Sequence, residues 1–198
     1  MSSIDRLDAA SLDLLFREAR THSFWSDRPV AEADLKAAVE LMKMAPTSAN
    51  CSPARIVFVT SAEAKAKLKD ALAPGNVDKT MSAPVTAILA WDPAFYEKLP
   101  FLFPHADARS WFAGNATLAD ATARLNTALQ IGYFILALRA VGLDAGPMTG
   151  FDAAKVDAAF FAAGSARASV LINIGHGDPA KLFPRSPRFA YDEIATTV

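Results

Sequence analysis

"LNTALQIGYFILALRAVGL", residues 125–143, is the one stretch of this chain that resembles a membrane span. Asn126, Gln130 and Arg139 interrupt it, whereas a span needs about 20 nearly uninterrupted apolar residues. A helix that is apolar on nearly every face is instead typical of a buried central helix or of an oligomer interface. We therefore predict a long core helix over residues 117–141.

The segments around this helix predict a chain of mixed α and β structure. Helices are expected at about 8–22, 31–44, 62–72 and 152–161, and strands at 54–60, 85–91 and 168–174. "GLDAGPMTGFD", residues 142–152, is interpreted as a turn. Strands that alternate with helices are compatible with a parallel sheet, so the pattern alone leaves the topology open.

The C-terminal segment predicts an extended tail. Pro184 and Pro187 are incompatible with a regular helix or a central strand across it. Phe183, Phe189 and Tyr191 then need a surface to lie on, and that surface is often a partner subunit. We therefore expect a homodimer.

Composition limits the possible functions. The 198 residues are 52% apolar and 21% charged, which predicts one globular domain over residues 1–198. A net charge of −1 gives no general attraction to nucleic acid or to an anionic membrane. "MSSIDRLDAASLD" has neither a basic nor an apolar signal-peptide region, so we expect a cytoplasmic protein.

Several stretches resemble catalytic or metal-binding motifs but lack the context that such motifs require. "GHGDPA", residues 175–180, imitates a dinucleotide-binding fingerprint, but a proline-containing tail follows it where that motif requires a helix. Cys51 lacks a cysteine-hydrolase signature and is interpreted as a small buried hydrophobe. His22, His105 and His176 lack the spacing of a metal site, and no Gly-x-Ser-x-Gly motif is present.

Short polar clusters remain, each at the end of an apolar segment. Arg20, Thr21, His22 and Ser23 form the first cluster, which is compatible with a solvated helix end or with an anion site. The other clusters are Pro46–Asn50, Asn76–Lys79, Pro147–Gly150 and the pair Arg185 and Arg188. Cations combined with exposed backbone amides are suited to a ligand with a charged tail and a flat polar ring.

In their order along the chain, these clusters resemble the nitroreductase family of flavin mononucleotide (FMN) enzymes. The matching segments are "ARTHSFWSDRPV" (19–30), "APTSANCSPARIVFV" (45–59), "NVDKTMSAPVTAILA" (76–90), "GLDAGPMTGFD" (142–152) and "FPRSPRF" (183–189). The resemblance implies an α+β fold, in which helices flank a central mixed sheet. It also implies a homodimer whose C-terminal tails are exchanged.

The resemblance assigns a role in FMN binding to each cluster. Residues implied at the phosphate and ribityl chain are Arg20, Thr21, His22, Ser23, Arg185 and Arg188. Residues implied on the partner subunit's side of the flavin are Pro46, Thr47, Ser48 and Asn50. Asn76 and Lys79 are implied at the pyrimidine end, and Pro147, Thr149 and Gly150 near flavin N5.

The implied activity is hydride transfer from NADH or NADPH, through FMN, to a small acceptor, with no side chain acting as a catalytic acid or nucleophile. The family's second cationic residue in the first cluster is replaced here by Ser23 and Phe24. With Ser52-Pro53-Ala54 and "FLFPHADARSWF" (101–112), this departure resembles a subgroup that includes the malonic semialdehyde reductase of uracil breakdown.

The subgroup resemblance implies that malonic semialdehyde is reduced to 3-hydroxypropionate. Arg109 is then a candidate partner for the substrate carboxylate, although it is equally compatible with a solvated side chain. The alternatives are broad nitroarene or quinone reduction, and a flavin-binding protein without significant turnover.

Overall fold

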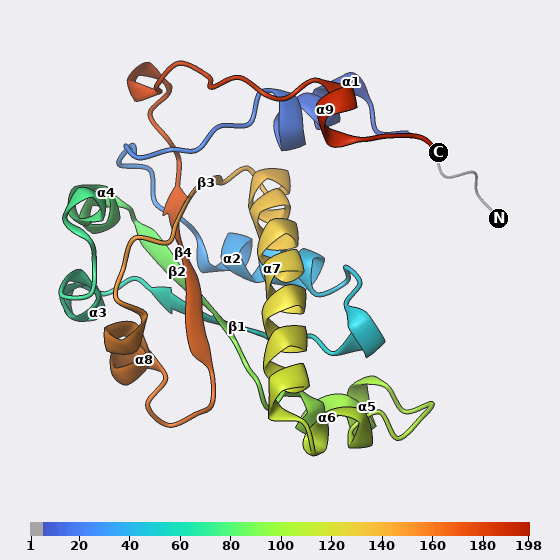
Figure 1. Cartoon of the computed structure of the whole chain (residues 1–198). Coiled ribbons are helices and arrows are strands. Elements are labelled where there is room, and N and C mark those ends of the chain that lie inside the picture. The colour runs from blue at the N-terminus through green and yellow to red at the C-terminus, as the bar shows by residue number, and fades with distance from the viewer. Residues whose placement is uncertain (1–5) are drawn as a thin grey trace.

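The centre of the fold is strand β2, which lies between two other strands of a four-stranded sheet (Figure 1). The computed structural model describes residues 6–198; the first five residues, part of the stretch used to exclude a signal peptide, lie outside the described residues. The strand order is β1-β2-β4-β3, and every neighbouring pair is antiparallel. The strands are β1 (Ala54–Val59), β2 (Val85–Trp91), β3 (Asp144–Met148) and β4 (Arg167–Gly175).

Helices cover both faces of the sheet, which explains why β2 reads as a continuous apolar run. Val85, Ala87 and Leu89 pack toward α7 and α2, whereas Ile88 faces the core beneath α3 and α8. Figure 1 shows α7 on one side of the sheet and α3 and α8 on the other. These helices are α2 (Glu32–Met42), α3 (Ala62–Lys69), α7 (Ala116–Ala140) and α8 (Ala153–Phe160).

Helix α7 confirms the predicted core helix, and glycine determines its end. Gly142 has a φ of 80°, and its N–H donates to the carbonyl of Arg139, while the N–H of Leu143 donates to that of Leu138. These two bonds form a Schellman motif, which requires a residue that tolerates left-handed φ. The chain therefore turns back beside the sheet. Among the described residues, no helix combines the length and hydropathy needed to cross a bilayer.

Three details differ from the expectations. The sheet is antiparallel rather than mixed, and the segment interpreted as a turn contains β3. Because proline is rare inside strands, Pro147 argues against a strand in the sequence pattern. However, β3 is at the edge of the sheet, where the missing N–H of proline is tolerated. The first helix ends at Arg17 instead of continuing to residue 22.

The shorter elements connect this framework. The helical ones are α1 (Ala9–Leu12), a π-turn (Asp13–Arg17), α4 (Val77–Ser82), α5 (Leu99–Leu102), α6 (Ser110–Ala113) and α9 (Tyr191–Ile194). The 3₁₀ turns are Ser48–Asn50, Pro74–Asn76, Phe95–Lys98 and Pro179–Lys181. The tail over residues 182–190 is extended, as its prolines predict.

Candidate functional site

The first polar cluster, Arg20–Ser23, is an extended segment held against the sheet rather than a helix end. The N–H of His22 donates to the carbonyl of Ala145 on β3 at 3.2 Å. Thr21 forms a parallel bridge with Ala145, and Trp25 forms an antiparallel bridge with Gly177, just beyond β4. We call residues 19–25 the clasp segment. It crosses the ends of β3 and β4.

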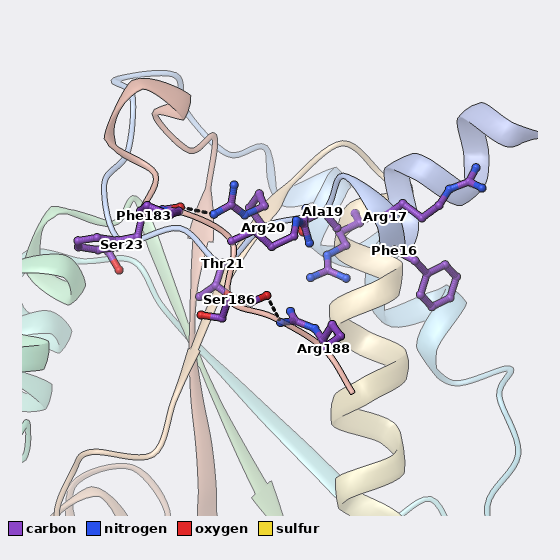
Figure 2. Close-up of a pocket in the computed structure, with 12 residues that line it drawn as sticks. Phe16, Arg17, Ala19, Arg20, Thr21, Ser23, Phe183, Ser186 and Arg188 are labelled. Carbon is purple, nitrogen blue, oxygen red and sulfur yellow. Dashed lines mark hydrogen bonds between the residues drawn. The ribbon is translucent and has the colours of Figure 1, made fainter. Parts of the chain in front are cut away.

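The clasp segment and the C-terminal tail enclose a cavity of about 670 Å³, the tail cavity (Figure 2). The Arg20 guanidinium donates to the carbonyl of Phe183, and Arg185 Nη2 donates to the carbonyl of Ala19 at 3.3 Å. The tail is thereby tied to the clasp segment by bonds in both directions. Five arginines line this cavity: Arg17, Arg20, Arg139, Arg185 and Arg188.

The tail cavity carries a marked excess of positive charge. Within residues 6–198, Asp13 is the one carboxylate within ion-pair distance of any of these five arginines, and it pairs with Arg17. Arg139 Nη1 donates to the carbonyl of Leu15 at 2.8 Å. Burial lowers the pKa of Arg139, and the nearby Asp144 carboxylate partly opposes this shift. Unpaired guanidinium groups around one cavity are the chemistry of a phosphate or carboxylate site.

Lys79 lines a second cavity, of about 550 Å³, which we call the lysine cavity. Ser23 and Phe183 line both cavities, so the two adjoin. A ligand could place an anionic end among the arginines and its other end beside Lys79. Of the predicted residues, Arg20, Ser23, Arg185 and Arg188 line the tail cavity, and Ser23 and Lys79 line the lysine cavity.

The turn after β3 is attached to the segment that precedes Lys79. Asn76 Nδ2 donates to the carbonyl of Gly150 at 2.7 Å, and the N–H of Ala73 donates to the same carbonyl at 3.0 Å. These bonds bring together two predicted clusters that are far apart in sequence. Thr149, between Gly150 and the end of β3, is exposed.

Comparisons with known proteins agree with this geometry. The model of the nitroreductase family matches residues 16–176. The chain belongs to the nitroreductase family. A Burkholderia lata protein is 62% identical over 189 residues, covering 96% of this chain and 97% of that protein, and its name gives an NADH dehydrogenase/NAD(P)H nitroreductase. A Xanthomonas oryzae protein with the same activities in its name is 58% identical, with 96% and 97% covered.

The fold is likewise that of solved nitroreductases. A nitroreductase from Exiguobacterium sibiricum, solved in complex with FMN, superimposes with a TM-score of 0.84 at 19% identity, and each chain is covered completely. The α+β fold implied by the resemblance is confirmed, and so is the enzyme class, an oxidoreductase.

In this nitroreductase, His22 differs from the other residues of the clasp segment. Its side chain is 7% exposed and does not line the tail cavity. Nε2 lies 3.6 Å from Asp144 Oδ1, and a Cβ at Gly177 would lie 1.9 Å from Nδ1. The imidazole thus packs under Gly177 and lines a smaller cavity of about 390 Å³ with Asp144. This smaller cavity shares Arg20 and Arg139 with the tail cavity, and the implied place of His22 at the phosphate stays a prediction.

The Pro46–Asn50 cluster belongs to a different part of the surface. Ser48 N–H donates to Asn126 Oδ1 at 2.8 Å, and Asn50 Nδ2 donates to the carbonyl of Leu102 at 2.9 Å. Ala49 and Asn50 both have a φ near 50°, a strained conformation for residues other than glycine. Pro46, Thr47, Ser48 and Asn50 line neither the tail cavity nor the lysine cavity of their own chain.

Two further residues are placed away from these cavities. Arg109 forms a bidentate pair with Glu97, both bonds being 2.8 Å, and its side chain is 45% exposed. The carboxylate of Glu97 raises the pKa of Arg109, and the guanidinium lowers that of Glu97. Cys51 is buried, and burial raises the pKa of its thiol to about 11, which agrees with its interpretation as a small hydrophobe.

Sequence reasoning missed two arginines of the tail cavity, Arg17 and Arg139. Arg139 was visible as a cation inside the core helix, but it was counted there only as an argument against a membrane span. Arg17 was assigned to a longer regular helix. The π-turn over Asp13–Arg17 and the early end of the helix bring it to the cavity.

Proposed function

We propose that this nitroreductase is an FMN-dependent oxidoreductase that uses NADH or NADPH to reduce a small acceptor. One observation carries the proposal: arginines without carboxylate partners in the described chain line a cavity that adjoins the cavity of Lys79. The names of the relatives in Burkholderia and Xanthomonas, and the FMN complex of the Exiguobacterium protein, support the same assignment.

The donor set fits FMN. Arg20, Arg185 and Arg188 would bind the phosphate dianion, because charge-assisted hydrogen bonds are roughly twice as strong as neutral ones. Thr21 and Ser23 add hydroxyl donors on the same wall of the tail cavity. The two bonds that tie the tail to the clasp segment place arginines from both ends of the chain at this cavity before a ligand binds.

Lys79 would tune the flavin. When bound, FMN supplies a ring nitrogen, N5, that accepts and returns hydride. A cation beside the pyrimidine end stabilises the negative charge that reduction places there, and we assign Lys79 this role, with Asn76 beside it. Thr149 and Gly150 would offer backbone N–H groups near N5, on the turn that Asn76 holds.

A homodimer completes the proposal, because Pro46–Asn50 lines neither the tail cavity nor the lysine cavity of its own chain. A second copy would bring this strained loop to the flavin. Apolar side chains left uncovered in the single chain support the pairing. Leu125 of α7 is 63% exposed, and Phe189 and Tyr191 of the tail are each 74% exposed. Tails exchanged between subunits would cover the two aromatic rings.

For the acceptor, we propose malonic semialdehyde, reduced to 3-hydroxypropionate, which would place the enzyme in pyrimidine catabolism. The support is the subgroup resemblance carried by the clasp segment, Ser52-Pro53-Ala54 and residues 101–112. Broad reduction of nitroarenes or quinones is the second candidate, favoured by the names of the relatives. Rates with the semialdehyde and with a quinone, measured side by side, distinguish the two.

FMN titration of Arg20→Ala and Arg188→Ala tests the proposed site. Each variant should bind FMN about 10- to 100-fold more weakly, because it loses a charge-assisted bond worth roughly 1.5–3 kcal/mol. Arg28→Ala, an exposed arginine that lines neither cavity, is the matched control and should bind FMN normally. Equal affinities in all three variants would refute the site.

Reduction of the bound flavin tests turnover. An oxidised FMN spectrum that neither NADH nor NADPH bleaches anaerobically would favour a flavin-binding protein without turnover.

A further inference from the structure

Two glycines, one at the end of β4 and one just beyond it, make room for two aromatic rings of the clasp segment. A Cβ at Gly175 would lie 2.7 Å from Trp25 Cε3, so a larger residue there would collide with the indole. Gly177 makes the same kind of room for the His22 ring. Gly175 and Gly177 belong to "GHGDPA", so the structure gives this motif a packing role in place of dinucleotide binding. The Trp25 indole therefore lies in a slot that a larger residue would close.

From this slot the indole reaches the residue that lines the lysine cavity. Trp25 Nε1 donates to the backbone carbonyl of Lys79 at 3.2 Å. Within α4, the same carbonyl accepts a hydrogen bond from the Ser82 hydroxyl at 3.4 Å. The bond from Trp25 is shorter and comes from outside the helix, so it ties α4 to the clasp segment.

A buried side chain of the sheet holds the same carbonyl. Asn173 of β4 is 1% exposed, and its Nδ2 donates to the carbonyl of Lys79 at 3.2 Å, while its Oδ1 accepts from the Thr86 hydroxyl at 2.8 Å. Asn173 fixes α4 to the sheet, whereas Trp25 fixes it to the clasp segment. Ser23, two residues before Trp25, lines both the tail cavity and the lysine cavity.

We propose that Trp25 is a positioning residue that links the phosphate-binding clasp segment to Lys79, so that the anion site and the flavin-tuning cation are held in one arrangement. The proposal rests on the proposed function, since it assigns Lys79 to the flavin. Its physical basis is a short connection: two residues of extended chain, a ring packed against Gly175, and one hydrogen bond to α4.

Trp25→Phe tests the link, because phenylalanine keeps an aromatic ring in the slot and removes the N–H donor. Trp91→Phe is the matched control, since Trp91 Nε1 also donates one hydrogen bond, to Asp120 Oδ1 at 2.9 Å. In the flavin-free protein, amide hydrogen exchange over Val77–Ser82 should be about five-fold faster in Trp25→Phe, as expected for one lost neutral hydrogen bond, and unchanged in Trp91→Phe. Equal exchange of this segment in both variants would overturn the proposal.

The FMN-bound protein gives a second, independent measurement. Trp25→Phe should lower the midpoint potential of bound FMN and slow its reduction by NADH or NADPH, with a smaller effect on the KM for the nucleotide. In a Lys79→Met background, the same substitution should no longer shift the potential, because the cation that it positions is absent. A shift of equal size with and without Lys79 would refute the link and leave Trp25 a purely structural residue.

Failure of the proposed function gives a different result. A wild-type protein that binds no FMN would refute the flavin assignment of Lys79, whereas amide exchange over Val77–Ser82 would still show whether Trp25 holds α4.

Discussion

The side-chain amide of Asn76 donates a 2.7 Å hydrogen bond to the carbonyl of Gly150, 74 residues away in the sequence. The bond ties the segment before α4 to the turn after β3. Because Asn76 directly precedes α4, which carries Lys79, this bond fixes the start of α4 relative to Thr149 and Gly150. Two clusters that look independent in sequence are thus one structural unit.

Gly150→Ala should disrupt this unit. An added Cβ would lie 2.4 Å from Asn76 Nδ2, so the amide must move and its hydrogen bond is lost. We expect a loss of roughly 1–3 kcal/mol in the free energy of unfolding, measured by urea denaturation, together with weaker FMN binding. Gly164→Ala is the control, because a Cβ there meets no atom of the described part of the chain within 4 Å. Equal stability of the two variants would show that Asn76 adapts freely.

Two neighbouring polar residues of α7 should respond to substitution in opposite ways. Asn126 is fully buried, and its Oδ1 accepts from Ser48 N–H. Asn126→Ala leaves that donor without its acceptor and should cost roughly 1–3 kcal/mol of unfolding free energy. Thr127→Val should be neutral or stabilising, because the buried Thr127 hydroxyl has no hydrogen-bond partner among residues 6–198.

The same two variants also test whether the loop Pro46–Asn50 contributes to FMN binding. Asn126→Ala should also weaken FMN binding, since Ser48 belongs to the loop that a second copy would present to the flavin. Thr127→Val should leave FMN affinity unchanged. If Thr127→Val destabilised the protein as much as Asn126→Ala, hydrogen bonding to the loop would not be the cause.

Cys51 should resist thiol reagents in the folded protein. A pKa raised to about 11 leaves roughly 0.1% thiolate at pH 8, and the side chain is 1% exposed. Reaction with a chromogenic disulfide should therefore be slow in buffer and rapid in denaturant. The same pKa shift makes the free energy of unfolding depend on pH, because the folded protein holds the thiol proton more tightly than the unfolded chain does. This contribution of Cys51 to the free energy of unfolding is complete below the unfolded pKa near pH 9, and it is lost as the pH rises toward 11. Rapid labelling of the folded protein at pH 8 would contradict both statements.

Arg109→Ala addresses the acceptor. If the guanidinium binds the carboxylate of malonic semialdehyde, the variant should raise the KM for the semialdehyde much more than that for a neutral quinone. Glu97→Gln is the companion variant, because it weakens the bidentate pair that now engages Arg109 and should lower the semialdehyde KM. Equal changes for both acceptors would remove Arg109 from the substrate site.

Much of the fold could be predicted from local pattern. The apolar run at 85–91 matches β2 residue for residue, and α7 begins and ends within one residue of its predicted bounds. Strand β3 was missed because Asp144, Gly146 and Pro147 are poor strand formers, which an edge position tolerates. Antiparallel pairing depends on contacts between strands that are distant in sequence, and no local pattern encodes it.

For the site, the sequence by itself determined which groups are available: cations and small polar residues at the ends of apolar segments, in an order typical of nitroreductases. Only the tertiary structure decided which of them meet. It packed the His22 imidazole beneath Gly177, brought Arg17 and Arg139 into the tail cavity, and tied Trp25 to Lys79. The physical reason is that residue type sets the charge and hydrogen-bonding capacity of a side chain. The direction in which that side chain points depends on packing against segments that lie elsewhere in the chain.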